Sequence, residues 1–152
     1  MRPAIEAMAE GDIEPIARLR LKAFFEGTDR TLDEDMAGLR RLIAGDGFEA
    51  AFVARNQDQP IGSCLLVRDE ISSPHDLTPW LAGLIVEEAC RGGGVGTALV
   101  KTVEAHAASA GVGMLYLYTW QARAFYEALG WRAVETFEQD GEPMLLMSRS
   151  LL

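Results

Sequence analysis

The sequence predicts a single α/β domain, residues 1–152, whose elements follow the order β-α-α-β-β-β-α-β-α-β-β. Apolar residues at three- and four-residue spacing predict the helices, and short apolar runs with β-branched residues predict the strands. Two polar turns between such runs predict antiparallel hairpins. A chain of 152 residues, 49% of them hydrophobic, is long enough to bury the core of one domain.

A strand and two helices are predicted at the N-terminal end of the chain. Pro3–Met8 is the strand, and Asp12 is the predicted N-cap of a helix that continues to about Phe25. A polar loop follows. Thr31 and Glu34 stand at the two positions of a capping box, which predicts the start of the second helix.

Three strands are predicted next. Phe48–Arg55 and Pro60–Val67 flank a polar turn and are expected to form a hairpin. Asp69–Pro79 is a long polar connection, and Trp80–Val86 is the predicted central strand of the sheet.

The stretch that follows the central strand carries the main functional signal. Four glycines lie within Arg91–Gly96, where the apolar period changes from that of a strand to that of a helix. Glycines are costly inside a helix, so they need another reason. A helix that begins here points unpaired N–H groups and its positive dipole end at the loop, and Arg91 adds a permanent charge. The loop is therefore predicted to bind a pyrophosphate.

Two common pyrophosphate motifs do not fit this loop. The dinucleotide fingerprint needs a small residue where Thr97 or Leu99 stands, and the P-loop needs a lysine where Thr97 stands. The loop does match the pattern R-x-x-G-x-G, as Arg91, Gly94 and Gly96.

The last part of the chain is predicted to hold a strand, a short helix and a hairpin. Gly113–Thr119 is the strand, and Ala122–Trp131 contains a helix with a glycine C-cap at Gly130. Trp131–Glu138 and Pro143–Ser150 flank an Asp-Gly turn, which is a strong hairpin signal.

The loop and the short helix together resemble the GNAT family of acetyl-CoA-dependent N-acetyltransferases. The pattern R-x-x-G-x-G is similar to the family's acetyl-CoA-binding motif. The family's A-x-x-F-Y-x-x-x-G-F/W element is matched by Ala122, Phe125, Tyr126, Gly130 and Trp131. Many members have an asparagine where this chain has Thr119, which leaves the contacts at the helix start open. The resemblance covers roughly the whole chain, and it implies a mixed central sheet with helices on both faces, an acyl-CoA N-acyltransferase-like fold.

The resemblance also implies acetyl-CoA as co-substrate. Its pantetheine arm would pair with the backbone of the central strand, and its thioester would lie where this strand and the strand 115–119 diverge. Backbone N–H groups freed there can polarise the thioester carbonyl, and such donors are worth about 3–4 kcal/mol each. The residues expected to bind the cofactor are Leu84, Ile85, Val86, Arg91, Gly92, Gly93, Gly94, Val95, Gly96, Thr97, Ala122 and Phe125.

Tyr126 is the predicted general acid that protonates the departing thiolate of coenzyme A. A phenol is a proton donor with a pKa of about 10, and Tyr126 matches the family position that often serves the leaving sulfur. The alternative is that Tyr126 is an aromatic residue of the core. The general base is less defined, because the central strand holds no acid or base. His75 and Asp76, in the connection before that strand, are weak base candidates, and ordered water is a third.

Composition narrows the location and the partners. A net charge of −9 argues against nucleic acid. A membrane span needs about 20 consecutive apolar residues, and no apolar run approaches this length. The N-terminus also lacks the layout of a signal peptide. We therefore expect a cytoplasmic protein without membrane contact. Cys64, Cys90, His75 and His106 show no metal-ligand spacing, so no metal is predicted.

The leading prediction is an N-acetyltransferase that moves the acetyl group of acetyl-CoA directly to a primary amine of a small molecule or peptide. In the family, the first two helices and their loop cover the acceptor pocket, but no residue pattern in this segment identifies the acceptor amine. A catalytically silent acyl-CoA-binding or regulatory module is the alternative, and a nucleotide-binding regulatory domain is a third interpretation. Homodimers are common in the family, and an exposed edge strand would suit one.

Overall fold

The computed structural model describes residues 4–70 and 76–152 of the chain. Its elements are β1 (Ala4–Ala7), α1 (Glu10–Phe24), α2 (Leu32–Ile43), β2 (Ala50–Asn56), β3 (Gln59–Val67), β4 (Trp80–Val86), the 3₁₀ turn η1 (Glu88–Cys90), α3 (Val95–Ser109), β5 (Met114–Thr119), α4 (Arg123–Ala128), β6 (Arg132–Gln139) and β7 (Glu142–Ser150). The order of helices and strands is the predicted one.

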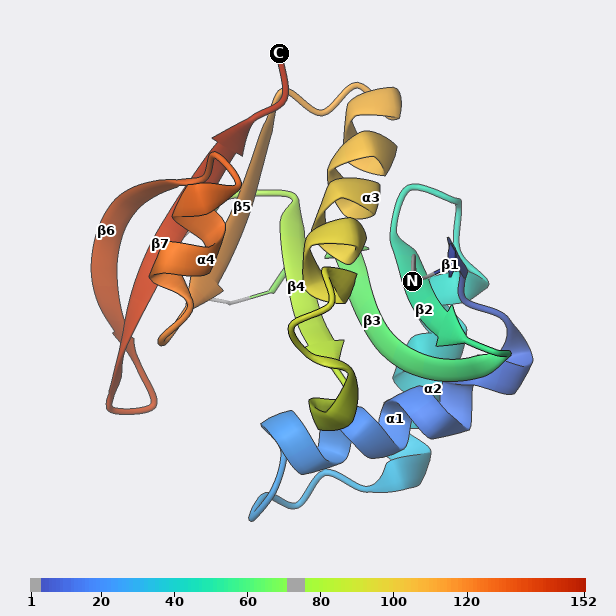
Figure 1. Cartoon of the computed structure of the whole chain (residues 1–152). Coiled ribbons are helices and arrows are strands. Elements are labelled where there is room, and N and C mark those ends of the chain that lie inside the picture. The colour runs from blue at the N-terminus through green and yellow to red at the C-terminus, as the bar shows by residue number, and fades with distance from the viewer. Residues whose placement is uncertain (1–3, 71–75) are drawn as a thin grey trace.

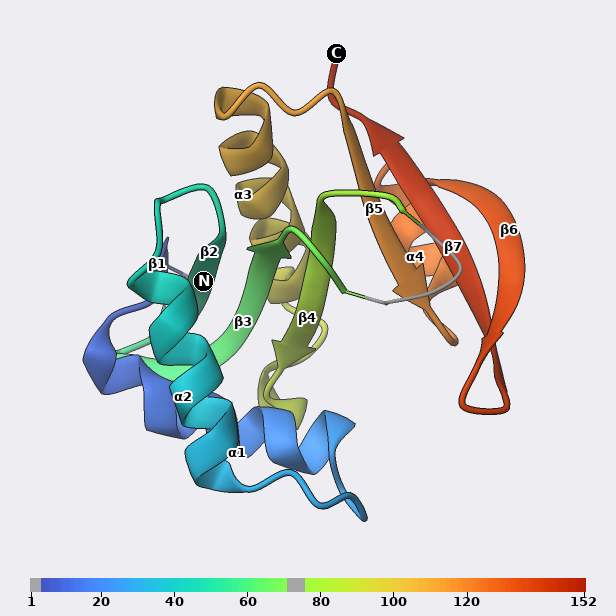
Figure 2. The ribbon, with the colours of Figure 1, turned by 180° about the vertical axis from the view of Figure 1, so that it is seen from behind.

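The strands form one seven-stranded sheet in the order β1-β2-β3-β4-β5-β7-β6. Helices α1 and α2 cover one face, and α3 and α4 cover the other (Figures 1 and 2). The sheet is mixed, because β4 and β5 pair in parallel and the other neighbours are antiparallel. The predicted α/β class with helices on both faces is confirmed. Within residues 4–70 and 76–152, no helix combines the length and the apolar character needed to cross a membrane.

Helix α1 begins earlier than predicted. Its N-cap is Ala9, so the expectation that Asp12 is the N-cap is wrong. Asp12 is instead the third helical residue, and its carboxylate reaches back to accept a hydrogen bond of 2.8 Å from the Ala9 N–H. The same carboxylate is buried and pairs with Arg55 of β2, at 2.8 Å from Nη2. The acidic residue thus fixes the helix start from inside the first turn and ties α1 to the sheet.

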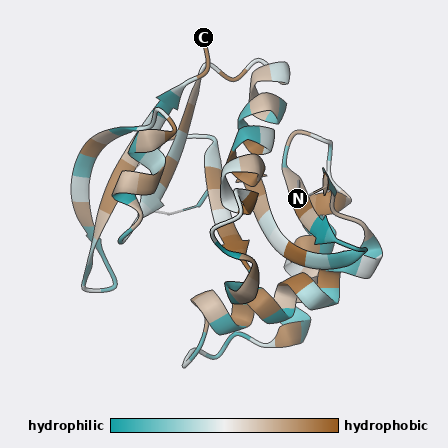
Figure 3. Cartoon of the chain, viewed as in Figure 1, coloured by the Kyte–Doolittle hydropathy of each residue, from teal (hydrophilic) through white to brown (hydrophobic). Residues whose placement is uncertain are grey.

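Local signals in the sequence set the other helix start and the hairpins. The capping box of α2 is formed, since the Glu34 N–H donates to Thr31 Oγ1 at 3.1 Å and the Thr31 N–H donates to Glu34 Oε1 at 2.8 Å. The β6–β7 turn places Asp140 and Gly141 at φ of +53° and +82°, and both predicted hairpins are antiparallel pairs. The tip of the β6–β7 hairpin is hydrophilic (Figure 3).

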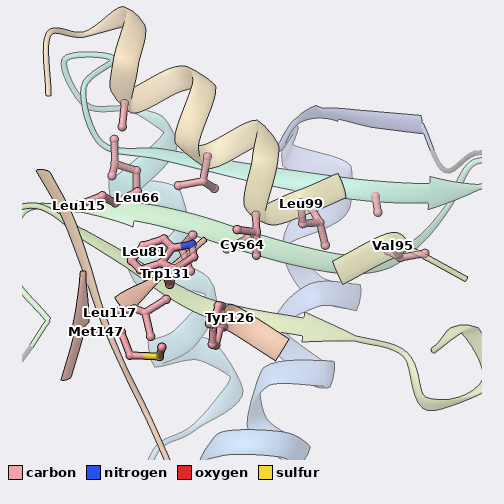
Figure 4. Close-up of a cluster of buried hydrophobic side chains, with 14 of the residues drawn as sticks. Cys64, Leu66, Leu81, Val95, Leu99, Leu115, Leu117, Tyr126, Trp131 and Met147 are labelled. Carbon is pink, nitrogen blue, oxygen red and sulfur yellow. The ribbon is translucent and has the colours of Figure 1, made fainter. Parts of the chain in front are cut away.

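The core consists of two apolar clusters, one on each face of the sheet. Under α3 and α4, Leu99 and Val103 pack against strand residues that include Leu66 and Leu117 (Figure 4). Under α1 and α2, the helix residues pack against a cluster that includes Trp80. Successive side chains of a strand point to opposite faces of the sheet, one toward α3 and α4 and the next toward α1 and α2. This alternation separates the two halves of the candidate site described below.

Candidate active site

The site begins where β4 and β5 separate. The two strands pair at Trp80 and Tyr116, and the Tyr116 N–H donates to the carbonyl of Pro79 at 3.2 Å. Beyond this point they diverge toward their C-terminal ends (Figure 1). Backbone groups of β4 and β5 past the junction are therefore released from pairing with each other.

A β-bulge in β4 lies beside this separation. The β3–β4 register passes from Ser63 opposite Ile85 to Leu65 opposite Ala82, so two residues of β4, Gly83 and Leu84, lie opposite one residue of β3. Gly83 has a φ of +63°, a conformation that favours glycine. A bulge turns backbone groups out of the ladder, and it does so here beside the place where the family resemblance implies the thioester.

The glycine loop continues from the end of β4. After η1, Gly92 and Gly94 adopt φ of +87° and +84°, and a Cβ at either would meet nothing within 4 Å. The exposed Arg91 donates from Nε to the carbonyl of Val86 at 3.1 Å. The loop is thus open toward solvent and carries a guanidinium anchored to the last residue of β4.

Helix α3 begins directly at this loop. Gly94 is its N-cap, and the first intrahelical bond runs from the Ala98 N–H to the Gly94 carbonyl at 3.0 Å. The amides of Val95, Gly96 and Thr97 precede that bond, so they have no acceptor within the helix. An open loop, three such donors and the positive end of the helix fit a pyrophosphate.

Gly96 marks the place where α3, α4 and β4 meet. A Cβ at Gly96 would lie 3.5 Å from Phe125 Cζ and 3.9 Å from Val86 Cγ2. The structure therefore brings three sets of residues predicted to bind the cofactor, from the central strand, the loop and the short helix, into one region.

The start of α4 resolves the question left by Thr119. The Ala122 N–H donates to Thr119 Oγ1 at 3.1 Å, so the threonine supplies the side-chain oxygen at this helix start. The end of α4 explains Gly130. A Cβ there would lie 1.9 Å from Arg149 Nη1, and this nitrogen donates to the Gly130 carbonyl at 3.1 Å. A side chain at this position would displace the arginine.

Tyr126 lies on the sheet side of α4. Its ring is buried, with 7% of the residue exposed, and it packs against Phe125 and Trp131 at centroid distances of 5.0 and 6.0 Å. Figure 4 shows Tyr126 and Trp131 in the apolar cluster. Burial raises the pKa of the phenol, and the nearby Cys64 adds to this effect. The Cys64 thiol donates to the carbonyl of Ala82, the residue before the bulge, at 3.7 Å. Tyr126 is therefore a protonated phenol near the bulged part of β4.

The two predicted base candidates, His75 and Asp76, stay predictions. His75 lies outside the described residues. Asp76 is exposed in the segment that leads into β4.

A different acid, Glu70, occupies the other face of the separation between β4 and β5. Tyr118 of β5 donates from its hydroxyl to Glu70 Oε1 at 3.3 Å. Although Glu70 as a residue is exposed, burial of its carboxyl group raises its pKa, and the hydrogen bond from Tyr118 and the charge of Arg20 oppose that rise. No local pattern in the sequence marks Glu70, because its partner Tyr118 lies 48 residues away along the chain.

Tyr118 belongs to an aromatic group on the face covered by α1 and α2. Its ring lies 6.4 Å from that of Trp80 and 6.1 Å from that of Phe137. Burial, with the nearby Glu70, raises the pKa of Tyr118 to about 12. Tyr118 is a hydrogen-bond donor at neutral pH and orients the carboxylate of Glu70.

Charged residues of α1 and α2 complete this face. Arg20 donates to the carboxylate of Asp35 at 2.9 and 3.3 Å, and Arg30 donates to it at 3.1 and 3.2 Å. Asp35 is 1% exposed. The third guanidinium nitrogen of Arg20, Nη1, lies 2.6 Å from the position a Cβ would take at Gly83. The arginine therefore rests on the β4 bulge from the side opposite to Cys64.

This chain combines a mixed α/β sheet whose central strands β4 and β5 separate, a bulge where β4 pairs with β3, and an open glycine loop at the start of α3 that fits a pyrophosphate. A model of the acetyltransferase (GNAT) family matches residues 13–131, and the chain belongs to this family. No curated protein matches the chain.

Solved structures agree in fold. A ribosomal-protein-alanine N-acetyltransferase from Brucella melitensis has a TM-score of 0.81 and 20% identity, covering 97% of this chain and 99% of that chain. A phosphinothricin acetyltransferase from Sinorhizobium meliloti, in complex with acetyl-CoA, has a TM-score of 0.80 and 15% identity, covering 99% and 89%. An aminoglycoside 6'-N-acetyltransferase complexed with coenzyme A has a TM-score of 0.78 and 18% identity, covering 98% and 97%. Two of the three hold coenzyme A or acetyl-CoA, in agreement with the predicted co-substrate.

Proposed function

We propose that this protein transfers the acetyl group of acetyl-CoA directly to a primary amine of a small molecule or peptide. The observation that carries the proposal is the meeting of the Arg91–Gly96 loop, the start of α3 and the Tyr126 helix beside the β4 bulge. The three neighbours bear the names of aminoglycoside, ribosomal-protein and phosphinothricin enzymes, so they favour an amine acceptor without choosing one.

The cofactor side of the reaction uses α3, α4 and β4. Arg91 and the amides of Val95, Gly96 and Thr97 hold the pyrophosphate, and the backbone of Leu84–Val86 holds the pantetheine arm. Acetyl-CoA supplies an activated acetyl thioester. Backbone N–H groups freed at the bulge polarise its carbonyl, and Tyr126 donates the proton that the leaving thiolate takes up.

The acceptor side needs a proton acceptor. A primary alkyl amine with a pKa of about 10.4 is neutral in roughly one molecule in a thousand at pH 7, so a base lowers the barrier. Glu70 joins His75 and Asp76 as a candidate base, and we favour Glu70 because its carboxylate has a defined hydrogen-bond partner. Its carboxylate accepts a hydrogen bond from Tyr118, and burial raises its pKa. This carboxylate takes a proton from the ammonium group of the acceptor, directly or through water. The amine nitrogen forms its bond to the acetyl carbon, and the bond from that carbon to sulfur breaks. The nitrogen then loses a second proton, which replaces the proton that Tyr126 gave to sulfur, so the products are the amide, the thiol of coenzyme A and protonated Glu70.

A silent acyl-CoA-binding module is the second candidate, because Tyr126 also belongs to the apolar cluster under α3 and α4. In that case the phenol of Tyr126 contributes only to packing and takes no part in a reaction.

We expect a cytoplasmic location under either candidate function, since both use acetyl-CoA. A homodimer through an edge strand, β1 or β6, remains a prediction.

Turnover separates the two candidates. The protein is incubated with acetyl-CoA and a panel of primary amines, the free thiol of coenzyme A is followed with Ellman's reagent, and acetylated product is identified by mass spectrometry. The proposal predicts amine-dependent thiol release with a matching product. Tight acetyl-CoA binding without any acetylated amine would support the silent module instead.

A further inference from the structure

The guanidinium of Arg20 is largely buried and held in one orientation by a buried carboxylate. Arg20 has only 11% of its side chain exposed, and two of its nitrogens are held by the buried carboxylate of Asp35. Desolvation of a buried guanidinium is costly, and the two hydrogen bonds to Asp35 compensate for part of that cost while they fix the orientation of the group. The planar fork of arginine then fixes where the remaining nitrogen points.

The remaining nitrogen, Nη1, is directed at the β4 bulge. It lies 2.6 Å from the position of a Cβ at Gly83, so any side chain larger than hydrogen would push the guanidinium away. Within residues 4–70 and 76–152, no protein group accepts a hydrogen bond from Nη1. Two N–H donors of a permanent cation therefore stand at the edge of the proposed acetyl-transfer point, on the face opposite to the cofactor helices.

A negative charge lies within electrostatic reach of this cation. Burial raises the pKa of Glu70, and the charge of Arg20 opposes that rise, while the carboxylate of Glu70 accepts its hydrogen bond from Tyr118, on β5. The two opposite charges are thus held apart by separate anchors, Asp35 for the arginine and Tyr118 for the glutamate. Such a pair complements a ligand that carries both charges itself.

We propose that the acceptor is an amine with an acidic group close to it, an amino-acid-like zwitterion, whose acid binds Arg20 Nη1 and whose ammonium faces Glu70. This inference rests on the proposed function and adds its substrate class. Arg20 acts as a specificity-determining residue, and Asp35 positions it. Arg30 shares Asp35 with Arg20, and both guanidinium groups lie over the Phe25 ring, at 5.2 and 5.9 Å. The atoms nearest to the Cβ position at Gly83 belong to Arg20 and Leu65, so we assign the specificity role to Arg20 and a structural role to Arg30.

The first test compares free L-α-amino acids with their methyl esters. The ester removes the acid, and it makes the amine less basic and so more often neutral, which favours the ester in intrinsic reactivity. Acetylation is followed by thiol release at saturating acetyl-CoA. We expect at least one amino acid to have a kcat/KM more than about 10-fold above that of its ester, the effect of a charged hydrogen bond.

The second test changes Arg20 with a matched control. Arg20→Gln and Arg30→Gln each leave one arginine on Asp35, so both variants retain a partner for the buried carboxylate. We expect Arg20→Gln to lower the ratio of kcat/KM for the amino acid to kcat/KM for its ester by about 10- to 100-fold, because the ester lacks the acid that Arg20 binds. Arg30→Gln should keep the ratio of amino acid to ester. Thermal melts of both variants verify folding.

Several results would overturn the inference. The inference fails if the esters are acetylated as well as the free amino acids. It also fails if Arg20→Gln leaves the ratio of kcat/KM for amino acid and ester unchanged, or if Arg30→Gln lowers that ratio equally. Acetylation of simple amines but of no amino acid, or acetyl-CoA binding with no amino acid acetylated, would overturn it as well. Failure to bind acetyl-CoA would instead remove the proposed function itself, and titration with acetyl-CoA before the assay distinguishes the two failures.

Discussion

On the face covered by α3 and α4, the candidate site is built mainly from backbone, whereas on the face covered by α1 and α2 it is built from charged and aromatic side chains. The cofactor side offers helix amides and a bulged strand around a short glycine loop. The acceptor side offers Arg20, Asp35, Glu70 and Tyr118, from four separate segments. A shared co-substrate can be held by backbone geometry, while the choice of acceptor is left to side chains that change without altering the fold.

Removing the carboxylate of Asp35 should have the largest effect on stability and should act on the acceptor side. Asp35→Ala leaves two guanidinium groups without their shared partner, and breaking a buried ion pair costs about 3–5 kcal/mol. Urea unfolding measures the loss. The folded fraction should still bind acetyl-CoA, since Asp35 lies on the other face. A loss below about 1 kcal/mol would show that the cluster is no anchor.

Replacing Tyr126 with phenylalanine tests the chemistry on the cofactor side. Tyr126→Phe keeps the ring packing against Phe125 and Trp131 and removes the proton donor. We expect kcat to fall about 100- to 1000-fold, because general acid catalysis contributes on this order. The Kd for acetyl-CoA should change less than about 2-fold by calorimetry, since phosphate contacts dominate binding. If kcat falls less than about 3-fold, Tyr126 is a core aromatic.

Replacing Glu70 with glutamine tests the base on the acceptor side. We expect kcat/KM near pH 7 to fall about 10- to 100-fold, at the low end for a general base because water can substitute in part. In the intact enzyme the base works when ionised, so kcat/KM should rise with pH through the raised pKa of Glu70. In Glu70→Gln, the rise of kcat/KM at low pH should disappear, whereas the rise at higher pH, which comes from deprotonation of the amine, should remain. A pH profile that retains the rise at low pH would assign it to another group.

A smaller effect is expected at the start of α4. Thr119→Val keeps the shape of the side chain but removes the oxygen that accepts from the Ala122 N–H. The change should lower the free energy of unfolding by about 1 kcal/mol, as for other helix-start oxygens. Thr119→Asn, which restores the residue common in the family, is the matched control and should stay within about 0.5 kcal/mol of the original. Equal stability of all three proteins would argue that this bond contributes nothing.

The sequence predicted what depends on local backbone geometry. The capping box at Thr31 and Glu34, the Asp-Gly turn and the glycine loop each occupy a few neighbouring residues, so their physical requirements are visible in the chain. The prediction of Asp12 as N-cap was wrong, because an acid at the third helical position can also cap the helix from inside the first turn. The sequence does not distinguish this position from the N-cap position. Glu70 and Arg20 could not be identified, because their roles come from partners that only the folded sheet brings near.

The most direct test of the cofactor site is isothermal titration with acetyl-CoA. Gly94→Glu and Gly111→Glu are a matched pair, since both glycines have positive φ, of +84° and +87°, and open space around them, at opposite ends of α3. Both variants carry the same strain and charge, but only the first places them on the proposed pyrophosphate. Tight binding to the original protein and to Gly111→Glu, with at least about 100-fold weaker binding to Gly94→Glu, is the predicted result. Equal binding by all three proteins, or no binding to the original protein, would contradict it.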